Sequence, residues 1–122
     1  MNRMLLVSML LSATGFARAA DAGNSWMAIG TLGCSQYVEG RKEESELQDR
    51  LVEMWASGYV TAANMLTADT FNLLANTSTK ALILSLKNYC RANPFSDTGM
   101  GLRVLIEELY PERHKAAKDA NK

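Results

Sequence analysis

The chain has 122 residues, of which 48% are hydrophobic, and its 13 basic residues balance 13 acidic ones. This length allows one domain at most, and the charge balance provides no excess of basic residues for a nucleic-acid surface. With one histidine and two cysteines, the chain also has few side chains for a metal site or for nucleophilic catalysis.

The first 20 residues, MNRMLLVSMLLSATGFARAA, have the pattern of a secretory signal. A basic residue, Arg3, precedes an apolar run over 4–11, and the alanines on either side of Arg18 fit a cleavage site after Ala19, with Ala20 or Ala22 as alternatives. The run is shorter than the roughly 20 residues that span a bilayer, so we expect no stable membrane insertion after cleavage. We therefore predict a signal peptide over 1–19, a helical domain over 20–110, a charged tail over 111–122 and a periplasmic location.

The two cysteines, Cys34 and Cys90, are predicted to form a disulfide. Export would carry them into an oxidising compartment, where an even pair in a small domain is usually bridged. Two buried free thiols are the alternative. A metal or haem site is not expected, because the chain has no C-x-x-C motif and its single histidine, His114, lies in the polar tail.

The segment around the first cysteine predicts a short helix over about 31–39, followed by a long helix. This segment is expected to pack against the other helices through Trp26, Ile29, Leu32, Cys34 and Tyr37. Ser45 with Gln48 three residues later forms a capping-box pattern that would begin the long helix, which should reach about residue 66. Asp49 is expected on a solvated charged face together with its neighbouring glutamates and arginine. The expected inward stripe consists of Leu47, Leu51, Met54, Trp55, Tyr59, Ala62, Ala63 and Leu66.

Two more helices are predicted. One begins at Ser78 or Thr79 and ends near 92, because Pro94 cannot continue it, and it should turn Cys90 inward. The last begins near 96–98 and ends before Pro111, and its Gly99 and Gly101 either weaken the first turn or allow close packing. The end of the tail is expected to fray. Together these elements predict an all-α fold of about four helices in one small domain, tied by one disulfide.

Five residues are candidates for binding or packing. Trp55 and Tyr59 are four apart and favour aromatic packing in the core over a ligand site. Gly58 between them is expected to let another helix approach closely. Asn64 is expected to hydrogen-bond nearby backbone, and Tyr89 should lie on the inward face beside Cys90. Methionines 27, 54, 65 and 100 are expected to fill the core, with an adaptable binding surface as the alternative.

Several of these motifs resemble those of a known protein family. Cys34 followed by Tyr37, the helical MWASGYVTAAN and the later LKNYCRANP resemble the HdeA/HdeB family of periplasmic acid-stress chaperones over most of 25–110. The resemblance implies that Cys34 and Cys90 occupy the disulfide positions of the family. It also implies a helical protein that exposes apolar surface in acid and holds unfolded protein clients. The segment between the cysteines is longer here than in that family.

A second resemblance implies a different partner. Export, GYVTAAN and the terminal LIEELYP are similar to small helical immunity proteins of type VI secretion systems, which bind a toxin. Those proteins usually carry additional cysteines, which this chain lacks. Under either resemblance we expect a non-enzymatic protein without a cofactor, with a protein partner or unfolded clients, no nucleic acid and no catalytic or metal-binding residues. The sequence leaves the oligomeric state open.

Overall fold

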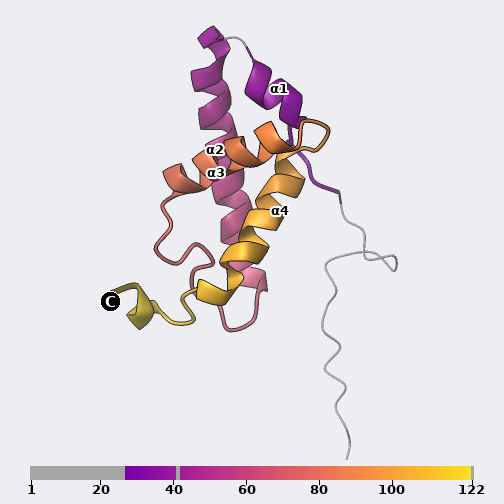
Figure 1. The fold of residues 1–122 in the computed structure, drawn as a ribbon. Helices are drawn as coiled ribbons and strands as arrows, with labels where there is room; N and C mark the ends of the chain where they lie inside the picture. The colour runs from indigo at the N-terminus through magenta and orange to yellow at the C-terminus, as the bar shows by residue number, and fades with distance from the viewer. Residues whose placement is uncertain (1–26, 41, 122) are drawn as a thin grey trace, which may run out of the picture.

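A computed structural model describes residues 27–40 and 42–121, and the predicted signal peptide and Trp26 lie outside these residues. The described part is all α-helical, with no β-strand and only two isolated bridges between extended residues. Figure 1 shows a long helix, α2, with the other helices grouped along it. The elements are α1 (Cys34–Glu39), α2 (Lys42–Leu66), α3 (Thr79–Ala92), α4 (Thr98–Leu109) and two short 3-10 helices, η1 (Tyr110–Glu112) and η2 (Ala117–Asn121).

The ends of α3 and α4 follow from local chemistry. The Ser78 hydroxyl accepts a hydrogen bond from the Ala81 amide, which caps the start of α3. Asp97 caps α4 in the same way by accepting from the Met100 amide at 2.9 Å. Helix α3 ends two residues before Pro94, as the sequence predicts. Both helices therefore lie close to their predicted bounds.

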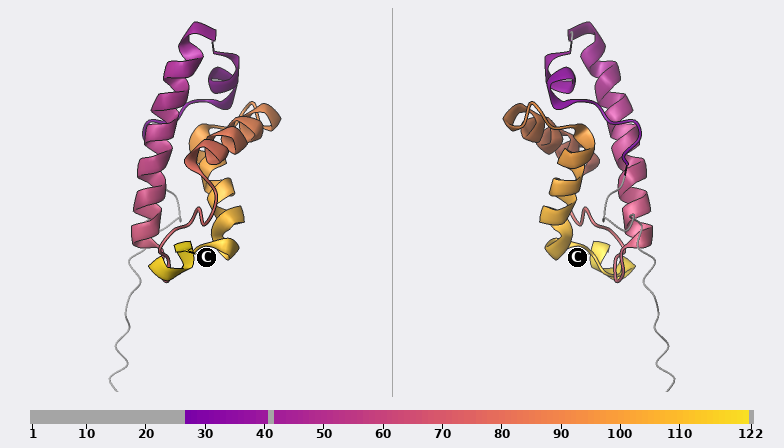
Figure 2. Two further views of the ribbon diagram at one scale, coloured as in Figure 1. Left: turned by 90° about the vertical axis from the view of Figure 1, so that its left-hand side faces the viewer. Right: turned by 90° about the vertical axis from the view of Figure 1, so that its right-hand side faces the viewer.

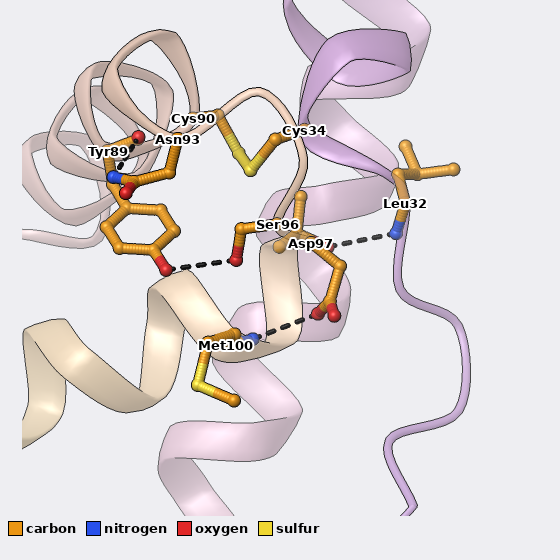
Figure 3. Close-up of a disulfide and its surroundings, with 9 residues drawn as sticks. Leu32, Cys34, Tyr89, Cys90, Asn93, Ser96, Asp97 and Met100 are labelled. Atoms are coloured by element: carbon orange, nitrogen blue, oxygen red, sulfur yellow. Dashed lines mark hydrogen bonds between the residues drawn. A yellow bond between two sulfur atoms is a disulfide. The ribbon is translucent and has the colours of Figure 1, made fainter.

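The predicted disulfide is confirmed and fixes α1 onto the end of α3. Cys34 begins α1 and Cys90 lies in the last turn of α3, with 4.7 Å between their Cα atoms. Both cysteines are buried, and the Cys34 amide also donates to the Ser96 carbonyl at 2.8 Å. Figure 3 shows the disulfide above a second tie, the bond between the Tyr89 hydroxyl and Ser96. The disulfide and these two hydrogen bonds thus hold the connection between α3 and α4 in place.

Helix α2 differs from the prediction in its start and in the face that it buries. It begins at Lys42, so Ser45 lies inside the helix rather than at its cap. Its buried residues are Val52, Ala56 and Val60, four apart, which join the core with α3. Much of the predicted inward stripe is instead exposed, with exposed fractions of 62% for Leu47, 56% for Leu51, 72% for Met54 and 77% for Leu66. The apolar residues of α2 cover more of its circumference than one packed face needs.

The close helix contact predicted at Gly58 is wrong, and the contact lies at Gly101 instead. Gly58 is exposed, and a Cβ added there would meet nothing within 4 Å. A Cβ on Gly101 would lie 2.6 Å from the Tyr89 ring and 2.7 Å from a Leu86 methyl group. Glycine therefore lets α4 pack closely on α3, which is the second of the two roles expected for Gly101.

The start of the charged tail packs on the molecule. The backbone of His114 forms an antiparallel bridge with Asn72, and its carbonyl also accepts from the Phe71 amide at 2.8 Å. The Arg113 guanidinium lies 3.9 Å from the centre of the Tyr110 ring. The contacts of His114 join the start of the tail to the connection between α2 and α3. Among the described helices, none is both long and apolar enough to cross a membrane.

Candidate functional site

An apolar groove lies between the segment before α1 and the middle of α2. Its volume is about 490 Å³. Met27 is 86% exposed and Ile29 81% exposed on one wall, and Met54 is 72% exposed on the other. We call this hollow the Trp55 groove, and its lining residues are Met27, Ala28, Ile29, Met54, Trp55, Gly58 and Tyr59.

Trp55 holds the two walls of the groove together. Its indole Nε1 donates to the Ile29 carbonyl oxygen at 2.7 Å. The chain then turns at Gly30, which has a φ of +84°. A Cβ on Gly30 would lie 3.1 Å from the indole Cδ1, so both the conformation and the space favour glycine. The ring of Tyr59 continues the aromatic surface, with its centroid 5.7 Å from that of Trp55.

Exposed apolar residues continue from the groove along the outer side of α2. Leu47, Leu51 and Met54 lie on its N-terminal half and Met65 on its C-terminal half, with Gly58 between them. We call these five residues the α2 apolar face. Figure 2 shows α2 along one side of the molecule, with α3 and α4 on the other. Large adjoining apolar residues on a small domain are typical of surfaces that bind other molecules.

Tyr59 also borders a second hollow, of about 340 Å³, between α2 and α4. Leu73, Ile106 and Tyr110 line its apolar part, and an ion pair at 2.8 Å between Arg103 and Glu107 lies at its rim. Burial is the main cause that raises the pKa of Tyr59; Arg103 lowers that pKa and Glu107 raises it. The Tyr59 phenol is therefore neutral at physiological pH and presents a polar group between two apolar hollows.

A polar cluster joins α1, α2 and α3 on the other side of α2. Asp49 accepts a hydrogen bond from the Tyr37 hydroxyl at 3.3 Å and pairs with the Lys87 ammonium group. The same ammonium lies 5.9 Å from the centre of the Tyr37 ring. Asp49 and Lys87 are only about one-third exposed, so the expected solvated role of Asp49 is wrong. Burial first, and the Asp49 carboxylate second, raise the pKa of Tyr37.

The five candidate residues separate into two groups. Trp55, Gly58 and Tyr59 come together in the Trp55 groove. Asn64 lies farther along α2, and its side-chain oxygen accepts from the Leu73 amide at 2.8 Å, which holds the connection after α2. Tyr89 packs against Gly101 and bonds Ser96 at 3.0 Å, so its contacts are structural.

Sequence reasoning did not find the wall formed by Met27 and Ile29. Ile29 is predicted to pack inward, and Met27 is expected in the core, yet both are exposed. The segment before α1 is irregular, with a bend at Gly30, and it is too short to show a periodic pattern, which removes the usual signal of orientation. The contact between Gly30 and Trp55 cannot be predicted from one sequence, because the two residues are 25 positions apart and no local pattern links them.

No group of three or more histidine, cysteine, aspartate or glutamate side chains among the described residues could hold a metal ion. The Nδ1 atom of His114 is buried without a hydrogen-bond partner. It lies in the docked tail rather than in either hollow, so it adds no reactive group to the Trp55 groove.

No protein-family model, curated protein or solved structure matches this chain.

Proposed function

We propose that the protein is a non-enzymatic, exported binding protein that holds unfolded protein clients under acid stress. The observation that carries this proposal is the continuous exposed apolar surface formed by the Trp55 groove and the α2 apolar face. A domain of this size normally buries such residues, and exposing them has a cost in solubility that a binding role would explain.

The composition of the groove suits clients of varied sequence. Met27 and Met54 have unbranched, flexible side chains that can adapt to different apolar surfaces. Trp55 and Tyr59 add rigid aromatic area on the groove floor. A dedicated partner would be expected to meet a more polar surface with several directional hydrogen bonds, since such bonds supply specificity. The groove is lined instead almost entirely by apolar groups.

Acid should expose further apolar residues, because a rise in net charge loosens the packing of the helices. Cleavage after Ala19 would leave 11 basic and 13 acidic side chains, a net charge of −2. Below about pH 3 the carboxylates are mostly neutral, so the net charge would rise towards about +12 with the histidine included. Repulsion should then loosen the helices, while the disulfide limits their separation and keeps the acid state compact.

The test is aggregation of a client protein that is moved to pH 2 and back to neutral pH. We expect the purified protein at a several-fold molar excess to lower light scattering by the client. The double variant Met27→Ser and Ile29→Ser should lose most of this protection, because it removes one wall of the groove. Leu84→Ser is the matched control, since Leu84 is 58% exposed on α3 and does not line the groove.

Two results would contradict the proposal. Unchanged scattering with the wild-type protein, while its own near-UV circular dichroism reports loosening, would exclude client holding and favour a dedicated partner such as a secreted toxin. Equal loss of protection in the groove variant and in Leu84→Ser would show that general surface hydrophobicity, rather than the Trp55 groove, binds the client.

A further inference from the structure

All four methionines in the described part of the chain are exposed. Met27 is 86% exposed, Met65 81%, Met54 72% and Met100 41%. The buried core of the described residues is built instead from leucine, isoleucine, valine, alanine, tyrosine and cysteine side chains. Core filling, the use expected for these methionines from the sequence, is therefore wrong for all four. Their side chains are accessible to reagents in the solvent.

Two of the four methionines face the same hollow. Met27 and Met54 line the Trp55 groove from its two walls, whereas Met65 and Met100 do not line it. The indole Nε1 of Trp55 already donates to the Ile29 carbonyl at 2.7 Å, so an oxygen atom added to either methionine would not find this donor free. An apolar ligand that covered such an oxygen would remove it from water without a hydrogen bond, which disfavours binding.

Thioether sulfur is the oxidisable sulfur on this surface. The two cysteines are buried and bonded to each other, so neither offers a free thiol. A thioether reacts with hydrogen peroxide in one two-electron step. The sulfur lone pair attacks one peroxide oxygen, an S–O bond forms as the O–O bond breaks, and the other oxygen leaves as water with both hydrogens. The product is methionine sulfoxide, which is polar and which methionine sulfoxide reductases convert back to methionine.

We propose that Met27 and Met54 form a reversible oxidation site for peroxides, and that their sulfoxides change the Trp55 groove from an apolar to a polar surface. The fold stays intact in the oxidised protein, because both side chains lie outside the core. Release of clients on oxidation would follow, and this consequence alone rests on the proposed function. The site and its effect on the groove depend only on exposure, position and sulfur chemistry.

The first test measures the oxidation rate of each methionine in the disulfide-bonded protein by peptide mass spectrometry, as a gain of about 16 Da per added oxygen. In dilute hydrogen peroxide at neutral pH, Met27 and Met54 should react as fast as Met65, the exposed methionine outside the groove, and faster than Met100. Near-UV circular dichroism of the same samples should stay unchanged. The inference fails if Met27 and Met54 react no faster than Met100, or if the dichroism is lost as they react.

The second test measures binding of the apolar dye Nile red before and after oxidation. Oxidation should weaken binding by the wild-type protein about tenfold, because the dye would cover polar sulfoxides. The double variant Met27→Leu and Met54→Leu keeps apolar side chains of similar volume without a thioether, so oxidation should leave its binding unchanged. The double variant Met65→Leu and Met100→Leu is the matched control and should respond as the wild type does. Methionine sulfoxide reductases should restore binding by the oxidised wild type.

Three results of the dye measurement would overturn the inference. They are an equal loss of binding in the Met27→Leu and Met54→Leu variant, unchanged binding by the oxidised wild type, and no binding by the wild type before oxidation. Client protection, measured on the same samples, separates the two proposals. Protection that survives oxidation while dye binding is lost would contradict client holding in the groove and support the oxidation site. Protection by the reduced protein, together with dye binding that oxidation does not change, would contradict the oxidation site alone.

Discussion

Tyr37 shows how burial of one phenol couples the fold to pH. Tyr37 is 5% exposed. Its hydroxyl donates a hydrogen bond to the Asp49 carboxylate, and its ring lies beside the Lys87 ammonium group. Burial, followed by the negative charge of Asp49, raises the pKa of Tyr37 above its ordinary value of 10.0. The folded state therefore holds the phenolic proton more tightly than the unfolded state does. This contribution to stability is complete below pH 10 and is lost as the pH rises through the folded pKa.

Tyr37→Phe removes this titrating group and should flatten the alkaline loss of stability. The difference in unfolding free energy between the wild type and the variant should fall as the pH rises above about 10, by up to about 1.4 kcal/mol per pH unit. Urea midpoints measured between pH 8 and 11 give this difference. Tyr110→Phe is the control, because Tyr110 is 43% exposed. Parallel pH curves for the wild type and Tyr37→Phe would mean that the proton on Tyr37 does not contribute to stability.

Single residues were predicted well where their chemistry acts on nearby backbone. Ser78 caps the helix that it precedes, and Asn64 accepts from a backbone amide, although this amide belongs to Leu73 rather than to the end of α2. Asp49 was placed wrongly because its partner, Lys87, is 38 residues away. Local hydrogen bonds leave a signal in the sequence, whereas an ion pair between two helices depends on how those helices meet.

At the scale of elements, α2 shows why a helix can be predicted and its orientation missed. Apolar residues cover a broad arc of α2, so the 3.6-residue period predicts a helix but several faces could point inward. The face that packs is the one with smaller side chains, Val52, Ala56 and Val60, which allow α2 to lie close to its neighbours. The larger residues on the adjacent arc are left exposed and form the candidate site.

Two glycines in helices should respond in opposite ways to the same substitution. Gly101→Ala should lower the free energy of unfolding by about 1–3 kcal/mol, because the new methyl group would press on Leu86 and Tyr89 between α3 and α4. Gly58→Ala should raise it by up to about 1 kcal/mol, because alanine favours helix and the position is open. Urea midpoints at low protein concentration measure both without a contribution from association.

The glycine pair distinguishes packing from helix propensity. A rise in stability for both variants would mean that α4 can move away from α3 at little cost. A fall for both would mean that Gly58 is packed in solution, as the sequence alone predicted, and would argue against the open position above it.

At the scale of the whole molecule, the helical fold could be predicted from the sequence because the boundaries of α3 and α4 have local causes. Ser78, Asp97 and Pro94 lie at the bounds of α3 and α4, and the pair Cys34 and Cys90 sets one contact between helices. The Trp55 groove could not be predicted in the same way. One of its walls is an irregular segment without periodicity, and that wall is placed by a hydrogen bond from Trp55 to the Ile29 carbonyl.

The disulfide stabilises the whole molecule because it ties the short helix α1 to α3 and closes a large covalent loop. Helix α1 has six residues, too few to be stable alone, and it packs mainly against α3. The bond from Cys34 to Cys90 spans 56 residues and therefore encloses α1, α2 and most of α3 in one covalent loop. Restricting a loop of this length in the unfolded chain stabilises the fold by roughly 4 kcal/mol in the loop-entropy model.

Removing the disulfide should therefore loosen the molecule from the α1 end. The variant with both Cys34→Ala and Cys90→Ala should lose up to about 4 kcal/mol of unfolding free energy. Its α1 amides should lose hydrogen-exchange protection before those of α3 and α4, whose contact through Gly101 and Leu86 does not involve the sulfur atoms. Exchange measured by mass spectrometry separates these regions. Uniform loss of protection would show that the helices unfold as one unit. Unchanged protection in α1 would show that the Cys34 amide, bonded to the Ser96 carbonyl, and the buried Tyr37 hold α1 without the covalent bond.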